Sequence, residues 1–194
     1  MNTVLSFCFK GERNYVHGTD IVAKLFSHFP QNNITDVDMK FNDITSTNLL
    51  LVDGNEAENA KVNIRVKLDG EEKLMQLVES GEPINCRYEY DEYQIINKTK
   101  IDLKLKQICL TESTEYNACE NFVAMNKHLL QKLYPDEKGK WYFTRLEQKI
   151  MIKNDALITV KLIKNFNFRL TKSDIILNGK VIGSVYFTMV KDKI

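Results

Sequence analysis

The C-terminal stretch SDIILNGKVIGSVYFTMV, residues 173–190, constrains the fold more than any other part of the sequence. Two runs rich in β-branched and aromatic residues flank an Asn178-Gly179 pair. Both residues of this pair tolerate the positive φ angles of a type I′ turn, which joins two adjacent antiparallel strands. The stretch therefore predicts a β-hairpin with strands over residues 173–177 and 181–190.

A similar hairpin is predicted in the first half of the chain, around an Asp69-Gly70 pair. Residues 61–68 alternate apolar and polar side chains, as in a strand with one buried face. Residues 74–78 are predicted to return as the paired strand, although this run is rich in helix formers.

Two helices are predicted, over residues 19–29 and 115–134. Each has apolar residues along one side at helical spacing, and each is closed by a proline, Pro30 or Pro135. Thr19 is the predicted N-cap of the first helix, because its hydroxyl can accept a backbone hydrogen bond.

The remaining strands are predicted over residues 3–9, 34–41, 48–52, 87–96, 101–110, 140–148 and 157–168. The chain is therefore predicted to be an α+β protein. The two closing prolines lie 105 residues apart and the two turn glycines lie 109 apart. These similar offsets favour an internal duplication, with halves at 1–82 and 83–194. The alternative is a single α+β domain with coincidental spacing.

The charge balance argues against two classes of partner. The chain has 27 Lys and Arg against 26 Asp and Glu, so no strong attraction to nucleic acid or to an anionic membrane is expected. No apolar run approaches the roughly 20 residues that span a bilayer. The apolar stretch 4–9 is too short for the core of a signal peptide. We therefore expect a cytoplasmic protein.

Cysteine and histidine usage gives no sign of a metal or a disulfide framework. The four cysteines, Cys8, Cys86, Cys109 and Cys119, show no CxxC spacing and lie in apolar or strand-like segments. Free thiols are expected. The three histidines show no paired ligand spacing, so neither a metal nor a cofactor is expected.

The closing hairpin at 168–190, with Asn178-Gly179-Lys180 at its turn, and a weaker counterpart at 61–78 resemble the hotdog superfamily. This superfamily includes acyl-thioester dehydratases and thioesterases. Tyr15-Val16-His17-Gly18 resembles the Val-His segment of A-factor-biosynthesis hotdog proteins. The resemblance covers most of the chain in element order but only short stretches in residues.

The resemblance implies a double hotdog, two halves that are each a helix packed against a curled antiparallel sheet. It also implies an acyl ligand, carried as a thioester of coenzyme A or of an acyl carrier protein. Two halves that satisfy each other would form a monomer, whereas single hotdogs dimerise, so a monomer or a homodimer is expected.

His17 is the leading catalytic candidate because it directly precedes the first helix. An imidazole there can act as general acid or base, and the Gly18 N–H, at the positive helix end, can bind a thioester carbonyl. By the resemblance, Glu120 in the second helix is the partner of His17 at the interface of the halves. The alternatives are that His17 caps its helix and that Glu120 favours the helix dipole.

Four further residues are expected to bind substrate. Asn117 and Asn121 lie with Glu120 in the first turns of the second helix, and Asn126 lies on its apolar side. Asn126 either lines a ligand tunnel or ties the helix to the sheet. Arg13 is expected to meet the phosphates of coenzyme A or of a carrier-protein arm, with surface charge at a turn as the alternative.

A non-catalytic function stays open. The Gly-His-Phe-Pro context of the dehydratases is absent around His17, which favours a module that binds an acyl ligand or a partner protein on the same scaffold. A further alternative is an interaction protein that docks through an exposed sheet edge.

Overall fold

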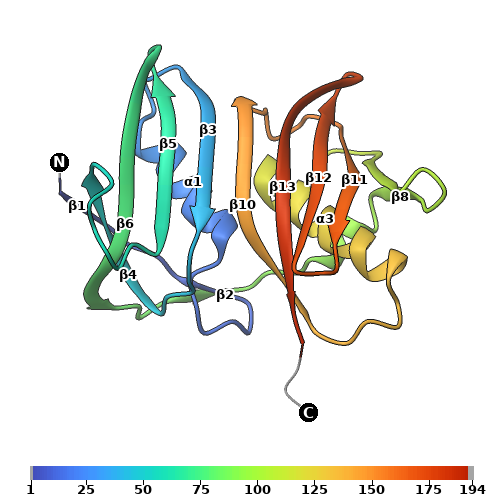
Figure 1. Ribbon diagram of the computed structural model, residues 1–194, viewed down its shortest axis with the longest axis horizontal. Helices are drawn as coiled ribbons and strands as arrows, with labels where there is room; N and C mark the ends of the chain where they lie inside the picture. Colours follow the sequence, from blue (N-terminus) through green and yellow to red (C-terminus); the bar gives the residue numbers. More distant parts are fainter. Residues whose placement is uncertain (1, 192–194) are drawn as a thin grey trace. The chain divides into compact units, whose positions relative to one another are not determined.

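The computed structural model describes residues 2–191 and separates into two compact units, Met1–Asp91 and Glu92–Ile194 (Figure 1). In both units most strands pair antiparallel with few helices among them, so the predicted α+β class is confirmed. No helix in the described part of the chain is both long enough and apolar enough to cross a membrane.

The described residues of the first unit, drawn from blue to green in Figure 1, form seven strands and one helix. These are β1 (Thr3–Leu5), β2 (Phe9–Lys10), α1 (Gly18–His28), β3 (Ile34–Phe41), β4 (Thr47–Asp53), β5 (Val62–Leu68), β6 (Glu71–Pro83) and β7 (Arg87–Tyr88). Within this unit the antiparallel strands follow the order β1-β4-β6-β5-β3.

The predicted hairpin of the first half is confirmed as β5 and β6. Asp69 and Gly70 have φ angles of 52° and 87°, as a type I′ turn requires. The apolar side chains of β5 are buried, and its Asn63 and Lys67 are not. The returning strand β6 is longer than the predicted 74–78, because it pairs with β4 as well as with β5.

Helix α1 begins one residue before its predicted start. Its N-cap is His17, whose side chain makes no capping hydrogen bond, so the prediction of Thr19 as N-cap is wrong. Thr19 lies instead inside the first turn and is only 1% exposed. The helix buries an apolar face that includes Val22 and Leu25. It ends at His28, before Pro30, as predicted.

The predicted first strand, 3–9, is interrupted. Its residues divide between β1, which pairs with β4, and β2, which pairs in parallel with β7. Sequence periodicity does not reveal this break, because the partner strand β7 lies far along the chain.

As far as residue 191, the second unit, drawn from yellow-green to red, contains two helices and six strands. These are α2 (Tyr93–Ile96), β8 (Thr99–Asp102), β9 (Gln107–Leu110), α3 (Ala118–Leu133), β10 (Lys140–Ile150), β11 (Ile158–Phe166), β12 (Leu170–Leu177) and β13 (Lys180–Val190). Its antiparallel strands follow the order β10-β13-β12-β11-β9-β8.

The predicted C-terminal hairpin is confirmed as β12 and β13, with φ angles of 50° and 75° at Asn178 and Gly179. The predicted long helix is confirmed as α3, which packs against β9 and β11. All of its first nine residues are buried, and Phe122 and Met125 have no exposed surface.

Two predicted strands of this region are wrong in part. The stretch 87–96 forms only the two-residue β7 before the short helix α2. The stretch 101–110 folds back as the hairpin β8–β9, because Asp102 accepts the backbone N–H groups of Lys104 and Leu105, each at 3.0 Å. Such a side-chain contact to the backbone favours a turn over a strand.

Candidate functional site

The side chain of His17 is held at the start of α1 by its neighbour in the first turn. Nδ1 of His17 lies 2.7 Å from Oγ1 of Thr19. The backbone carbonyl of His17 accepts the N–H groups of Asp20 and Ile21 at 3.0 and 3.2 Å. The half-buried imidazole is thereby fixed at the positive end of the helix dipole.

Beneath this turn lies a buried cation. Lys10 has no exposed surface, and its Nζ donates to Thr19 Oγ1 at 3.0 Å and to Asp20 Oδ1 at 3.1 Å. The ammonium also lies 4.1 Å from the centre of the Tyr90 ring. A buried charge needs such partners, because losing water without them costs several kcal/mol.

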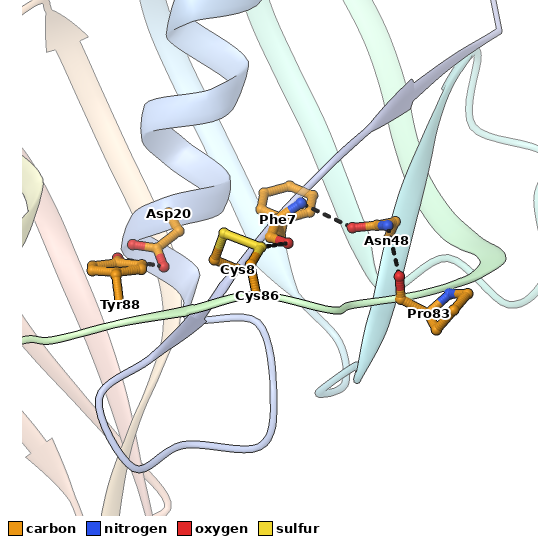
Figure 2. The surroundings of a disulfide bond; sticks show 7 residues. All are labelled: Phe7, Cys8, Asp20, Asn48, Pro83, Cys86 and Tyr88. Carbon is orange, nitrogen blue, oxygen red and sulfur yellow. Dashed lines mark hydrogen bonds between the residues drawn. A yellow bond between two sulfur atoms is a disulfide. The ribbon is translucent and has the colours of Figure 1, made fainter.

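Asp20 joins this network to β7. Its Oδ2 accepts the Tyr88 hydroxyl at 2.8 Å (Figure 2). The hydroxyl of Thr19 also reaches Asp20 Oδ1, at 3.3 Å. We call His17, Thr19, Asp20, Lys10 and Tyr88 the α1 cluster.

A disulfide lies beside the α1 cluster, between Cys8 and Cys86 (Figure 2). The prediction of free thiols is wrong for this pair, since the fold brings together two cysteines that are 78 residues apart. Among the residues that the structure describes, Cys109 and Cys119 form no disulfide, as predicted.

Arg13 and Gly18, the other two predicted site residues of the first unit, lie near the α1 cluster. The Arg13 guanidinium approaches the Lys10 carbonyl at 3.5 Å and the centre of the Tyr90 ring at 5.6 Å. Gly18 is the first residue of α1 and is half-buried. Their roles toward phosphate and carbonyl groups stay predictions.

In the second unit, Asn117 and Glu120 form a capping box at the start of α3. Asn117 Oδ1 accepts the Glu120 N–H at 3.0 Å, and Glu120 Oε2 accepts the Asn117 N–H at 3.0 Å and its Nδ2 at 2.7 Å. Reciprocal contacts of this kind satisfy the free donors of a helix start. They give both residues a structural role, and the pairing of Glu120 with His17 stays a prediction.

The other two asparagines of α3 differ in their partners, although neither has exposed surface. Asn121 accepts the Thr114 hydroxyl at 2.7 Å and donates to the Tyr116 carbonyl at 3.4 Å. Neither side-chain polar atom of Asn126 has a hydrogen-bond partner in the described part of the chain. The interpretation that Asn126 ties the helix to the sheet therefore finds no hydrogen bond to support it.

Sequence reasoning missed that Lys10 and Tyr88 take part in the α1 cluster. The only local signal was Asp20, an acid in the first turn of a helix beside Thr19. Tyr88 lies 68 residues from Asp20, and no spacing rule connects positions so far apart. Within residues 2–191, no group of three or more His, Cys, Asp or Glu side chains is arranged to hold a metal ion.

Comparison of the sequence with protein families and with curated proteins finds no match. Among solved structures, the tesB protein of Mycobacterium avium subs paratuberculosis matches 97% of this chain and 93% of its own length, with 10% identity and a TM-score of 0.53. The dehydratase domain of PpsC from Mycobacterium tuberculosis, solved in complex with C12:1-CoA, matches 97% of this chain and 92% of its own length, with 7% identity and a TM-score of 0.53. At these identities the likeness shows the fold, which is the hotdog fold.

Proposed function

We propose that this protein binds and processes acyl thioesters of coenzyme A or of an acyl carrier protein, on two hotdog-like halves. His17 serves as general acid and base, and Glu120 is its proposed partner. The fold supports the proposal, because a hotdog-fold dehydratase domain has been solved with an acyl-CoA. A shared fold does not fix a function, so the case depends on the α1 cluster.

The observation that carries the proposal is the contact between His17 Nδ1 and the Thr19 hydroxyl. That hydroxyl has a single proton. When the proton points to Asp20, Nδ1 donates to Thr19, and Nε2 carries the lone pair of a base. Once Nε2 has taken a proton from the substrate or from water, the imidazolium is the acid that returns it, and its Nδ1–H still donates to Thr19. Transfer of one proton to and from Nε2 therefore exchanges the two roles, while the contact at Nδ1 stays the same.

The Lys10 ammonium supports this exchange. It donates to the Thr19 oxygen in both states, and so holds the hydroxyl beside the imidazole. The first N–H groups of α1, beginning with Gly18, lie at the positive helix end. They are suited to polarise a thioester carbonyl while His17 moves a proton at the adjacent carbon or at an attacking water.

The test is turnover of a panel of acyl-CoA and enoyl-CoA thioesters by His17→Ala. General acid–base catalysis contributes about 10²–10⁴-fold, so a loss of that size is expected. His28→Ala, at the last turn of the same helix, is the matched control and keeps its rate. Thr19→Val keeps the side-chain shape and is expected to alter the pH profile. An unchanged rate in His17→Ala would rule out the mechanism.

A second candidate is a non-catalytic acyl-binding module. The capping box supports it, because Glu120 and Asn117 already have a structural role. The unpartnered Asn126 supports it as well, since a buried amide gains most from a polar group on a ligand. The test is native mass spectrometry after gentle purification, where a retained acyl ligand in wild type and its loss in Asn126→Leu are expected. Wild-type protein without ligand, and without thermal stabilisation by acyl-CoA, would contradict it.

A further inference from the structure

The two shortest strands of the first unit are held together by more than their own pairing. β2 and β7 share only the pairs Phe9–Arg87 and Lys10–Tyr88, and a two-stranded ribbon of this length is not stable alone. The disulfide directly precedes both strands, with Cys8 before β2 and Cys86 before β7.

A second tie, through Asn48 of β4, lies on the side of the disulfide away from these strands. Asn48 accepts the Phe7 N–H at 2.8 Å and donates to the Pro83 carbonyl at 3.2 Å (Figure 2). This tie keeps the two segments near each other without reaching β2 or β7. The disulfide joins the same two segments covalently and lies closer to Asp20 and Tyr88 than Asn48 does.

The disulfide fixes the two residues that clamp Asp20. Lys10 and Tyr88 each stand two positions after a bridged cysteine. Lys10 Nζ binds Asp20 Oδ1 at 3.1 Å, and the Tyr88 hydroxyl binds Asp20 Oδ2 at 2.8 Å. One carboxylate oxygen of Asp20 is therefore bound by the segment that follows Cys8, and the other by the segment that follows Cys86. The neighbouring Thr19 contacts His17.

A reductant can reach the disulfide. Cys86 is exposed and Cys8 is half-buried, and exposed disulfides are the labile and regulatory ones. Cys86 Sγ lies 3.4 Å from the Phe7 carbonyl oxygen, so a thiol at Cys86 has an acceptor once the bridge is open. In a reducing compartment, disulfides that form are usually transient or redox-sensing.

We propose that the Cys8–Cys86 disulfide is a redox switch that sets the order of the α1 cluster. A dithiol reductant attacks the exposed Cys86 sulfur, the S–S bond breaks, and Cys8 leaves as a thiolate. The second thiol of the reductant then attacks the mixed disulfide and releases Cys86. Two electrons and two protons pass to the protein, and the reductant becomes a disulfide. β2 and β7 then lose their covalent link and keep only hydrogen bonds between them, and the clamp on Asp20 loosens.

The effect of the switch on turnover rests on the proposed function, but its effect on α1 needs no substrate. The test is amide hydrogen exchange of the oxidised protein with and without dithiothreitol. Faster exchange, roughly tenfold or more, is expected at Asp20 and Ile21, whose N–H groups bind the His17 carbonyl. In α3 the equivalent hydrogen bond joins the Asn121 N–H to the Asn117 carbonyl, and the exchange rate of this amide is expected to stay unchanged.

Variants separate the switch from other effects of the reductant. Cys8→Ser with Cys86→Ser is expected to reproduce the reduced state, whereas Cys109→Ser, at a free cysteine, keeps the response to dithiothreitol. Tyr88→Phe removes one side of the clamp and is expected to speed exchange at Asp20 without reduction. Tyr93→Phe, at a tyrosine that is 73% exposed, is its control.

A spectroscopic signature completes the test. On reduction, the ring signals of His17 are expected to move in a ¹H–¹³C spectrum, whereas those of His28 and His128 stay in place. Exchange and His17 signals that are identical in both redox states would overturn the proposal. Loss of protection throughout the chain would overturn it too, because the disulfide would then only hold the fold together.

Discussion

At the scale of single residues, the α1 cluster depends on one ion pair. Lys10 has no exposed side-chain surface, and its carboxylate partner Asp20 is 15% exposed. Neither charge is well solvated, so each depends on the other. The hydroxyls of Thr19 and Tyr88 supply further hydrogen bonds to this pair.

Asp20→Asn is therefore expected to lower the free energy of unfolding by about 3–5 kcal/mol, the cost of leaving a buried charge unpaired. Adding Lys10→Met removes the stranded cation and is expected to recover much of that loss. Urea denaturation of the wild type and of the two variants measures both effects. A double variant no more stable than Asp20→Asn alone would show that the pair is not the main contribution.

A second prediction compares two buried amides of α3. Asn121→Leu removes the hydrogen bonds to the Thr114 hydroxyl and to the Tyr116 carbonyl, so we expect a loss of about 1–3 kcal/mol in the free energy of unfolding. Asn126→Leu removes polar atoms without a protein partner, so we expect the ligand-free protein to be equally or more stable. Denaturation curves show whether Asn121→Leu is less stable than Asn126→Leu, as expected. Equal losses would mean that Asn126 has a partner, such as a bound water.

Burial lowers the pKa of His128 below its ordinary value of 6.5, and the Lys132 ammonium lowers it further, against the opposing effect of Glu92. As pH falls through about 6.5, the unfolded chain binds a proton at this histidine before the folded protein does. Stability is therefore expected to fall from about pH 7.5 to pH 5.5, and less so in His128→Gln. Denaturation across this range measures the difference, with His28→Gln as control. A slope unchanged by His128→Gln would contradict the assignment.

At the scale of elements, the sequence patterns correctly predicted the helices and hairpins that neighbouring residues specify. The hairpin turns at 69–70 and 178–179 depend on residues that accept positive φ, and α3 depends on a long apolar stripe. The patterns failed at the β2–β7 pair, which depends on a contact between distant residues, and at Asp102, whose side chain favours a turn. They also failed to predict the α1 cluster, which depends on a contact between distant residues as well.

The prediction for the elements concerns the close packing of strands β10 and β13. A Cβ at Gly183 of β13 would lie 2.3 Å from the Glu147 carbonyl oxygen of β10. Gly183→Ala must therefore push the two strands apart, at a cost of about 1–3 kcal/mol or more. Gly179→Ala meets no atom within 4 Å and carries only the strain of its φ of 75°, about 1 kcal/mol. Thermal unfolding compares them, and a milder effect at Gly183 would argue against this register.

At the scale of the whole molecule, the likeness to solved hotdog structures covers nearly the full chain at 10% identity or less. At such low identity, the fold is the property that the proteins share. In this sequence, only the order of the elements and the two hairpins indicated that fold. The contacts of the candidate site could not be deduced in the same way, because they depend on side chains that the element order does not specify.

The proposed function requires that His17, at the start of α1, meet the thioester group of an acyl ligand. A ¹H–¹³C histidine spectrum of the oxidised protein, recorded during titration with an acyl-CoA thioether that cannot be cleaved, tests this contact. We expect saturable shifts of the His17 ring signals, with those of His28 and His128 unmoved. Saturable binding that leaves His17 in place, or no binding at any accessible concentration, would contradict it.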